Sequence, residues 1–192
     1  MIEIYATSIG ENAFSTKKRE LLIKNIIDEK LKIQPKKIII SKNAYGKPYL
    51  TNKRNFHFNI SHSGKWVVCA VGERPVGIDI EFIDQINLET AEKIAERFFS
   101  DEEYEDLFTR EEKDILAYFY EIWTLKESFI KAIGKGLTIP LNSFTVKIGK
   151  SGIELKSRFR TKYCFEQYNI DRDYRMAVCS TDSNFASEII FK

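Results

Sequence analysis

Apolar residues recur at helical spacing in the run of chain that stops at Gly134 and Gly136. At about 100° per residue they form one stripe, which predicts an amphipathic helix with that stripe in the core. Glu127 and Lys131 lie one turn apart at the edge of the stripe, where a cleft wall would be, although an ordinary Glu–Lys pair on a solvated helix has the same spacing. Lys126 falls within the stripe, so its side chain is expected to snorkel or to line the cleft. The stripe consists of Tyr118, Ile122, Leu125, Phe129 and Ile133.

The remaining pattern predicts strands before and after a group of helices. Helices are expected over residues 17–31 and 88–98, and Thr109 with Glu112 forms a capping box that starts the long helix. Residues 61–65 are expected at the tip of a hairpin. Because the strands do not alternate regularly with helices, the order indicates an α+β fold. Strands are expected over residues 2–7, 38–40, 56–60, 66–71, 76–82, 143–148, 153–157, 163–170 and 174–180, the last four as an antiparallel meander.

Composition narrows the class of protein. The chain has 192 residues, of which 43% are hydrophobic and 13% aromatic, as in a globular domain. It contains no run of about 18 apolar residues that would span a membrane, and its start does not resemble a signal peptide, so we expect a cytoplasmic protein. Its three cysteines are far apart among apolar neighbours, which predicts buried thiols rather than disulfides or a zinc site.

Charge is unevenly distributed, although the net charge is only +2. Residues 1–70 hold 13 Lys and Arg against 5 Asp and Glu, residues 71–130 hold 6 against 17, and residues 131–192 hold 11 against 6. A basic first third suggests an anionic ligand, and an acidic middle third suggests a cation site. A solvated face is nevertheless the commoner explanation for a run of like charges.

Two acids alternate with apolar residues in the strand expected over residues 76–82. Asp79 and Glu81 face one side of that strand, about 7 Å apart along the chain. Two carboxylates on one face repel each other unless they are solvated, protonated or share a cation. Oxygen ligands without neighbouring His or Cys favour Mg²⁺ or Mn²⁺ over zinc. The alternatives are a magnesium site half built by its ligand and an exposed strand face with two solvated acids.

Two further residues could contact a phosphate. His62 lies between Ser61 and Ser63 in a polar turn, which offers hydroxyls, backbone N–H groups and an imidazole. Lys47 lies in a turn that Pro48 stiffens. A plain surface turn explains His62 equally well, and Lys47 is weak evidence by itself.

Together these residues resemble one family. Five phrases occur in order, and two more follow them. They match the pattern of Sfp-type 4'-phosphopantetheinyl transferases over roughly residues 43 to 182. The five are Gly46-Lys47-Pro48, Phe58-Asn59-Ile60-Ser61-His62-Ser63, Val76-Gly77-Ile78-Asp79-Ile80-Glu81, Arg97-Phe98-Phe99-Ser100 and Trp123-Thr124-Leu125-Lys126-Glu127-Ser128-Phe129-Ile130-Lys131, followed by Gly134-Lys135-Gly136-Leu137 and Tyr174-Arg175-Met176-Ala177-Val178-Cys179.

The resemblance implies an α+β pseudo-dimer, in which two similar halves enclose the active site in the cleft between them. Here the halves would be residues 1–88 and 89–192. The protein would act as a monomer that binds coenzyme A and an apo acyl or peptidyl carrier protein, with no nucleic acid or membrane partner. The helix and loop between residues 82 and 99 would form part of the surface that docks the carrier.

The activity implied is that of a holo-[acyl-carrier-protein] synthase, or 4'-phosphopantetheinyl transferase. A carrier serine would attack the β-phosphate of coenzyme A and release 3',5'-ADP. The resemblance assigns Mg²⁺, or Mn²⁺, to Asp79, Glu81 and Glu127. Glu127 would also be the base, directly or through a metal-bound water, and the catalytic set would be Glu127, Lys131 and His62. Contacts to coenzyme A would come from Lys47, Pro48, Ser61, His62, Lys131 and Arg19.

The chain departs from the family in its N-terminal region, which is shorter than the usual one that carries basic residues for the 3'-phosphate of coenzyme A. Lys17, Lys18 and Arg19 fill that role or belong to a solvated helix start. The alternative function is a non-catalytic module that binds coenzyme A or a carrier protein, and a magnesium phosphodiesterase is a weaker one. Retention of Asp79 and Lys131 favours the transferase over a decayed enzyme.

Overall fold

The computed structural model describes residues 1–9, 15–32, 37–83 and 86–192, and the side chains of residues 15–19 lie outside that description. No helix of the described ranges is long and apolar enough to cross a membrane. The expected α+β class is confirmed by the order of the elements. The helices are α1 (Ser15–Leu31), α2 (Leu88–Phe98), α3 (Asp101–Leu107) and α4 (Glu112–Ile133), with 3-10 turns η3 (Gly136–Thr138) and η4 (Leu141–Ser143). The strands are β1 (Ile2–Ser8), β2 (Ile40–Lys42), β3 (Pro48–Leu50), β4 (His57–Ser63), β5 (Trp66–Gly72), β6 (Val76–Phe82), β7 (Thr145–Gly149), β8 (Gly152–Lys156), β9 (Cys164–Gln167), β10 (Tyr174–Ser180) and β11 (Phe185–Phe191).

Two sheets form the centre of the molecule. Sheet I has the strand order β11-β1-β5-β4, and sheet II has the order β6-β10-β9. The pairs β2–β3 and β7–β8 form separate antiparallel hairpins. In sheet I, β11 runs parallel to β1, whereas β1, β5 and β4 are antiparallel neighbours.

The last strand of each half of the chain pairs with a strand of the other half. The first half runs α1, β2–β3, β4–β5, β6, and the second repeats this order as α4, β7–β8, β9–β10, β11. Strand β6 pairs with β10 of the second half, and β11 pairs with β1 of the first. This exchange is the architecture of a pseudo-dimer, with β1 as an extra strand of sheet I. The boundary expected near residue 88 stays a prediction.

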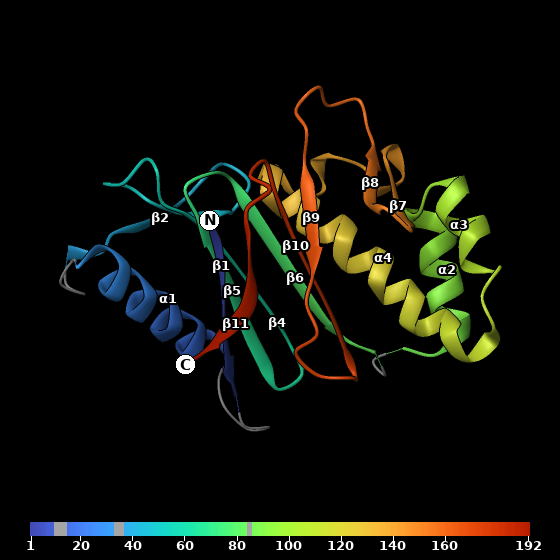
Figure 1. Ribbon diagram of the computed structural model, residues 1–192, viewed down its shortest axis with the longest axis horizontal. Coiled ribbons are helices and arrows are strands. Elements are labelled where there is room, and N and C mark those ends of the chain that lie inside the picture. Colours follow the sequence, from blue (N-terminus) through green and yellow to red (C-terminus); the bar gives the residue numbers. More distant parts are fainter. Residues whose placement is uncertain (10–14, 33–36, 84–85) are drawn as a thin grey trace.

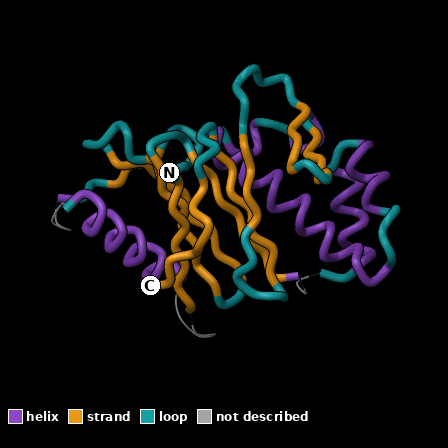
Figure 2. The backbone as a smooth tube through the Cα atoms, in the orientation of Figure 1, coloured by secondary structure: helices purple, strands orange, loops and turns teal. Residues whose placement is uncertain are grey.

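The layers follow the apolar faces of these elements. One buried cluster fills the space between the sheets, and includes Ile4 of β1, Ile78 of β6 and Val178 of β10. A second lies between α1 and sheet I, and a third between α4 and sheet II. Helices α2 and α3 pack against the far side of α4. The molecule therefore has α1 and α4 on opposite sides of the paired sheets (Figures 1 and 2). The three cysteines are free thiols; Cys69 and Cys179 are buried as expected, whereas Cys164 is only partly buried.

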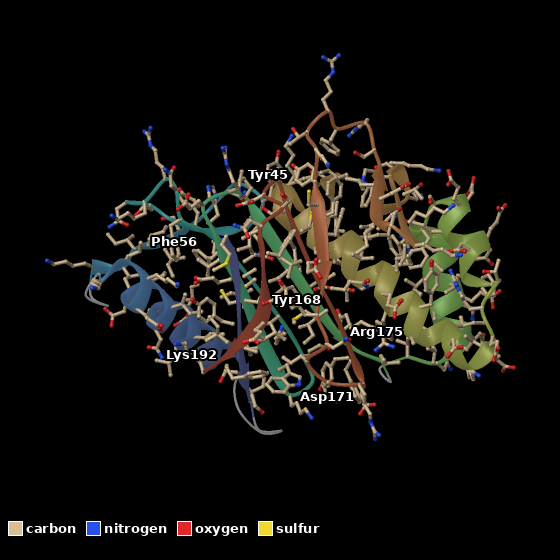
Figure 3. All side chains as sticks on the ribbon, in the orientation of Figure 1. Tyr45, Phe56, Tyr168, Asp171, Arg175 and Lys192 are labelled. Carbon is tan, nitrogen blue, oxygen red and sulfur yellow. The ribbon has the colours of Figure 1, made fainter. Side chains whose placement is uncertain are left out.

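Several strand predictions need correction. Residues 61–63 lie within β4, and the turn that follows contains Gly64 at a φ of 50°. The four late strands do not form one meander, because β7 and β8 pair only with each other while β9 and β10 belong to sheet II. The pattern did not predict β11, whose side chains are mostly exposed and do not alternate in burial. Figure 3 shows Lys192, just after β11, beside α1, where its ammonium pairs with Glu29 at 2.6 Å.

The predicted capping box of the long helix is wrong. Helix α4 begins at Glu112 with Glu111 as N-cap and no side-chain cap, and the Thr109 hydroxyl donates to the carbonyl of Asp106 instead. A capping box does occur one helix earlier. The backbone N–H of Ser100 donates to Glu103 at 2.8 Å, and that of Glu103 donates back to the Ser100 hydroxyl at 3.4 Å.

Glu103 also explains the position of Lys126. The Lys126 ammonium is fully buried, with 2.7 and 2.5 Å to the two oxygens of Glu103 and 2.8 Å to the carbonyl of Phe144. The backbone N–H of Val146 donates to the same carboxylate at 2.7 Å. Burial lowers the pKa of Lys126 to about 8, although the Glu103 carboxylate opposes the shift. Lys126 therefore neither snorkels nor lines a cleft, but ties α4 to α3 and β7.

We expect Lys126→Met to destabilise the protein by about 3–5 kcal/mol, because the variant leaves Glu103 as an unpaired buried charge. Urea unfolding followed by circular dichroism measures the loss. Adding Glu103→Gln should restore part of it, since glutamine is neutral and still accepts hydrogen bonds. The exposed i,i+4 pair of Glu89 and Lys93 provides the control, and Lys93→Met should change stability little. A small loss for Lys126→Met would contradict the structural role.

The loop over residues 43–48 closes the C-terminal end of α4. The Asn43 side chain donates to the carbonyl of Gly134 at 2.8 Å. The Lys47 ammonium donates to the carbonyls of Lys131 at 2.5 Å, Ala132 at 3.1 Å and Val76 at 2.9 Å. A cation is favourable at a helix C-terminus, where the last carbonyls lack intrahelical partners. Lys47 thus joins the end of α4 to the start of β6.

We expect Lys47→Met to lower the free energy of unfolding by about 1–3 kcal/mol, because the three carbonyls lose a charged donor. Thermal and urea unfolding of the variant measure this. Lys53→Met, which changes an exposed lysine close by in the sequence, is the matched control. Equal stability of the two variants would show that these hydrogen bonds do not hold the loop on the helix.

Candidate functional site

The site depends on how closely β6 approaches α4. Gly77 lies against the backbone of α4, and a Cβ built there would overlap the carbonyl of Ser128 and the backbone N of Ala132. A larger residue would therefore push the strand away from the helix. Alternation then turns Ile78 and Ile80 toward the space between the sheets, and Asp79 and Glu81 toward the helix.

Strand β4 holds β6 in place through a row of side chains. β4 and β6 are neighbouring edge strands of different sheets, and every second residue of β4 reaches across. Asn59 accepts from the N–H of Ile78 at 2.8 Å. The Ser61 hydroxyl donates to Asp79 at 2.8 Å, and that of Ser63 donates to Glu81 at 3.0 Å. These bonds explain why Ser61 and Ser63 are buried strand residues rather than parts of a turn.

Helix α4 brings Lys131 onto Asp79. Their side chains form an ion pair, with 2.5 Å between the Lys131 Nζ and the Asp79 Oδ1, and Lys131 also donates to the Ser61 hydroxyl at 3.1 Å. Burial lowers the pKa of Lys131, but the charge of Asp79 and its hydrogen bond outweigh burial and leave the pKa above its usual value. A residue of each half of the chain thus contributes to one pair.

Glu127 lies one turn before Lys131 and faces the same acids. Burial raises the pKa of Glu127, the charge of Asp79 raises it further, and Lys131 opposes both effects. Glu127 and Lys131 also line the same pocket. Glu81 is partly buried, and its charge also raises the pKa of Lys131. Of the four residues expected to act together, the structure therefore joins Lys131 to Asp79 directly and Glu127 to Lys131 through a shared pocket.

The donor set suits a divalent cation, although the acids do not form a ready cluster. Within the described ranges, no three His, Cys, Asp or Glu side chains are arranged as a metal site. However, Asp79 Oδ2 is buried and has no hydrogen-bond partner among the described residues. A buried carboxylate oxygen with no partner is unfavourable, and a hard cation between oxygen ligands would satisfy it. Asp79, Glu81 and Glu127 are the residues that would hold such an ion.

Two neighbouring pockets lie near the site, although Asp79 and Glu81 line neither of them. One, of about 270 Å³, lies between the loop at Tyr45 and the end of α4, and Glu127 and Lys131 line it. The other, of about 620 Å³, is lined by polar and apolar residues of α1, β2 and β4. Three residues line both pockets, so together they form one groove. The shared residues are Gly46, Pro48 and Asn59. Figure 3 shows Tyr45 near the C-terminal end of α4.

The remaining expected site residues have different positions. Pro48 lines the groove, as its expected contact to coenzyme A requires. His62 is exposed, and alternation along β4 places it on the face of Ile60 rather than beside the acids. Lys47 directs its ammonium to three carbonyls, and a contact with phosphate would require it to leave them. The side chain of Arg19 lies outside the described residues, as do those of Lys17 and Lys18.

The sequence interpretation missed Asn59 and Ser63 as supports of the acids. Their signal was the spacing of two residues that Asn59, Ser61 and Ser63 share in β4. It also missed the wall of the smaller pocket formed by Gly134 and Leu137, after the end of α4. Gly134 has a φ of 74° and ends the helix in the left-handed conformation, which glycine adopts without strain.

Comparison with known proteins agrees with this geometry. The family described as the 4'-phosphopantetheinyl transferase superfamily matches residues 75–179, and the family described as 4'-phosphopantetheinyl transferase, N-terminal, matches residues 13–74. The 4'-phosphopantetheinyl transferase Sfp of Bacillus subtilis (strain 168) is 41% identical over 182 residues, which cover 93% of this chain and 79% of that protein. The 4'-phosphopantetheinyl transferase gsp of Aneurinibacillus migulanus is 39% identical, over 95% of this chain and 75% of that protein.

A solved structure shares the fold of part of the chain. The holo-(acyl-carrier-protein) synthase of Bacillus anthracis, in complex with CoA (3',5'-ADP), superposes with a TM-score of 0.50 at 18% identity, over 57% of this chain and 96% of that one. At this identity the likeness supports the fold alone. The sequence relatives and the family match carry the assignment. The chain therefore belongs to the 4'-phosphopantetheinyl transferase superfamily and resembles its Sfp-type members throughout most of its length.

Proposed function

We propose that this chain transfers the 4'-phosphopantetheine group from coenzyme A to a serine of an apo carrier protein. The observation that supports the proposal is the ion pair between Asp79 of β6 and Lys131 of α4, with Lys131 and Glu127 lining the groove. The same residues belong to a chain 41% identical to a 4'-phosphopantetheinyl transferase. The binding-module alternative offers no reason for a cation next to three acids at a groove.

In the reaction, the oxygen of the carrier serine attacks the β-phosphate of coenzyme A. The bond from that phosphorus to the oxygen bridging the two phosphates breaks, and 3',5'-ADP leaves with the bridging oxygen. Lys131 binds a phosphate oxygen and orients the pyrophosphate, because its side chain lines the groove. Glu127 takes the proton of the serine, and its raised pKa brings its basicity closer to neutral pH.

Asp79, Glu81 and Glu127 would hold Mg²⁺, with Mn²⁺ as a substitute. When bound, the ion neutralises the charge of the pyrophosphate and of the leaving group, which is the main requirement of phosphoryl transfer. Ser61 positions Asp79 through its hydrogen bond. This bond supports a role for Ser61 in orienting Asp79 before the substrate arrives.

The groove would hold the nucleotide. Pro48 and the backbone beside it line the groove, and His62 lies on the β4 face of Ile60, which also lines it. We assign His62 to a nucleotide phosphate rather than to proton transfer, because β4 separates it from the reacting acids. Lys47 and Arg19 stay predicted contacts to coenzyme A, with Lys47 first requiring release from its carbonyls.

The carrier proteins would include peptidyl as well as acyl carriers, because the relatives that match this chain at 41% and 39% identity are the transferases Sfp and gsp rather than holo-acyl-carrier-protein synthases. The surface around α2 and the preceding loop is the proposed docking region. A monomer in the cytoplasm, with no nucleic acid or membrane partner, stays a prediction.

Incubation with coenzyme A, Mg²⁺ and a panel of apo acyl and peptidyl carriers tests the activity. We expect mass spectrometry to show the gain of one phosphopantetheine on a carrier, together with release of 3',5'-ADP. Carriers whose acceptor serine is replaced by alanine are the control and should stay unmodified. No mass gain on any carrier of a broad panel would overturn the transferase in favour of a binding module.

Asp79→Asn and Glu127→Gln should each lower kcat/KM by at least about 10²-fold, because each removes a charge aimed at the reacting phosphates. Steady-state transfer measures the loss, and circular dichroism confirms that the variants are folded. Glu121→Gln is the matched control, since Glu121 is on the same helix but pairs with Arg175 at 3.0 Å. Near-normal turnover of either site variant would refute the assignment of these acids.

A further inference from the structure

The ammonium of Lys131 binds Asp79, one of the carboxylates proposed to hold a metal ion. It contacts Asp79 Oδ1, while Ser61 donates to the same oxygen. The other oxygen of Asp79 is buried and has no partner among the described residues. The charge of Asp79 is therefore balanced by a side chain of this chain, while one of its two oxygens stays open to a cation.

An ammonium and a divalent cation seek the same carboxylate oxygens. When both are close to one carboxylate they repel each other, and the ion pair must be broken or weakened before the metal binds fully. A phosphate offers the ammonium another anionic partner. The metal and the phosphate therefore favour the same position of the Lys131 side chain, away from Asp79.

We propose that Lys131 competes with the divalent cation for Asp79, and that the pyrophosphate of coenzyme A relieves this competition by binding the ammonium. The inference rests on the proposed function. Metal alone binds weakly, and metal and coenzyme A strengthen each other's binding. By thermodynamic linkage, the factor by which coenzyme A tightens metal binding equals the factor by which metal tightens coenzyme A binding.

The surroundings of Lys131 permit the required movement. Its side chain is 27% exposed, whereas that of Asp79 is only 3% exposed. Lys131 lines the smaller pocket, so its flexible four-carbon stem can turn toward a ligand there. Its own carbonyl is held by Lys47 at 2.5 Å, so the backbone stays fixed while the side chain moves. The buried carboxylate is the fixed partner and the ammonium is the mobile one.

The remaining charges around the pair act in the same direction. Glu127 lines the same pocket as Lys131, and the Ser63 hydroxyl holds Glu81 as that of Ser61 holds Asp79. Removal of the ammonium leaves three carboxylates that repel one another, and this repulsion favours uptake of a cation in its place. Neutralisation of Lys131 should therefore raise the affinity for metal, although it removes a phosphate contact.

Binding of Mn²⁺ in the absence of a carrier tests the proposal without any turnover. Electron paramagnetic resonance measures free Mn²⁺ with wild-type protein, Lys131→Met and Lys131→Arg, each with and without coenzyme A. A titration of Mn²⁺ into coenzyme A alone corrects for the complex in solution. Lys135→Met removes one positive charge from an exposed position one turn further on, and is the matched control.

Without coenzyme A, we expect Lys131→Met to bind Mn²⁺ about tenfold more tightly than wild type, the change that corresponds to one pKa unit of charge interaction. Lys131→Arg keeps the positive charge beside Asp79, and Lys135→Met keeps the Lys131–Asp79 ion pair. Both variants should therefore bind Mn²⁺ like wild type. Coenzyme A should tighten Mn²⁺ binding more in wild type than in Lys131→Met. The proposal would be overturned if Lys131→Met bound Mn²⁺ no more tightly than wild type. It would also be overturned if Lys131→Arg bound Mn²⁺ as tightly as Lys131→Met.

Thermal unfolding gives a second readout if Lys131→Met is less stable. Mn²⁺ should raise the Tm of Lys131→Met by more than that of wild type, because tighter binding to the folded state stabilises it more. A smaller or equal shift would count against the competition. Transfer by the wild-type enzyme is measured separately, so loss of this inference would leave the proposed function intact.

Discussion

The close contact of β6 with α4 is the constraint on which the rest of the structure depends. Gly77 permits it, because a side chain at that position would overlap the backbone at Ser128 and Ala132. Once the strand lies there, its pleat directs Asp79 toward Lys131. Strand β6 belongs to the first half of the chain and α4 to the second, so one contact both assembles the fold and forms the site. The contact between β6 and α4 therefore stabilises the fold and also positions the residues of the candidate site.

Buried charges play two different roles along α4. Lys126 is surrounded by a carboxylate and a carbonyl, and its interactions are complete. Lys131, five residues later, binds one oxygen of Asp79, whereas the other oxygen of Asp79 has no hydrogen-bond partner among the described residues. The Lys131 side chain is also partly exposed and lines a pocket. The same helix thus carries one buried, fully hydrogen-bonded ion pair that joins helices and one ion pair whose ammonium is partly exposed. Complete hydrogen bonding marks the structural pair, and an incomplete set marks the pair proposed to act in function.

The sequence predicted the acids well because alternation in a strand is local information. Asp79 and Glu81 were placed on one face, and Glu127 with Lys131 at a helix edge, before any tertiary contact was known. It could not predict Ser61 and Ser63 in β4, because serine favours turns unless a neighbouring strand provides acceptors. The three carbonyls bound by Lys47 come from distant segments and leave no local pattern. Strand β11 was not predicted for the same reason, because its pairing partner β1 lies at the other end of the chain.

Pairing of β11 with β1 also determines when folding can be completed. Ile4 and Ile189 are register partners, so this edge of sheet I joins the two ends of the described chain. Contacts of such long sequence separation form slowly, because loop closure must occur first. During synthesis on a ribosome, β1, β4, β5 and β6 emerge early. One edge of β1 stays unpaired until β11 is made, and β6 stays unpaired until β10 is made. Two strand edges therefore stay open during synthesis, and they are the places where a nascent chain is most exposed to wrong partners.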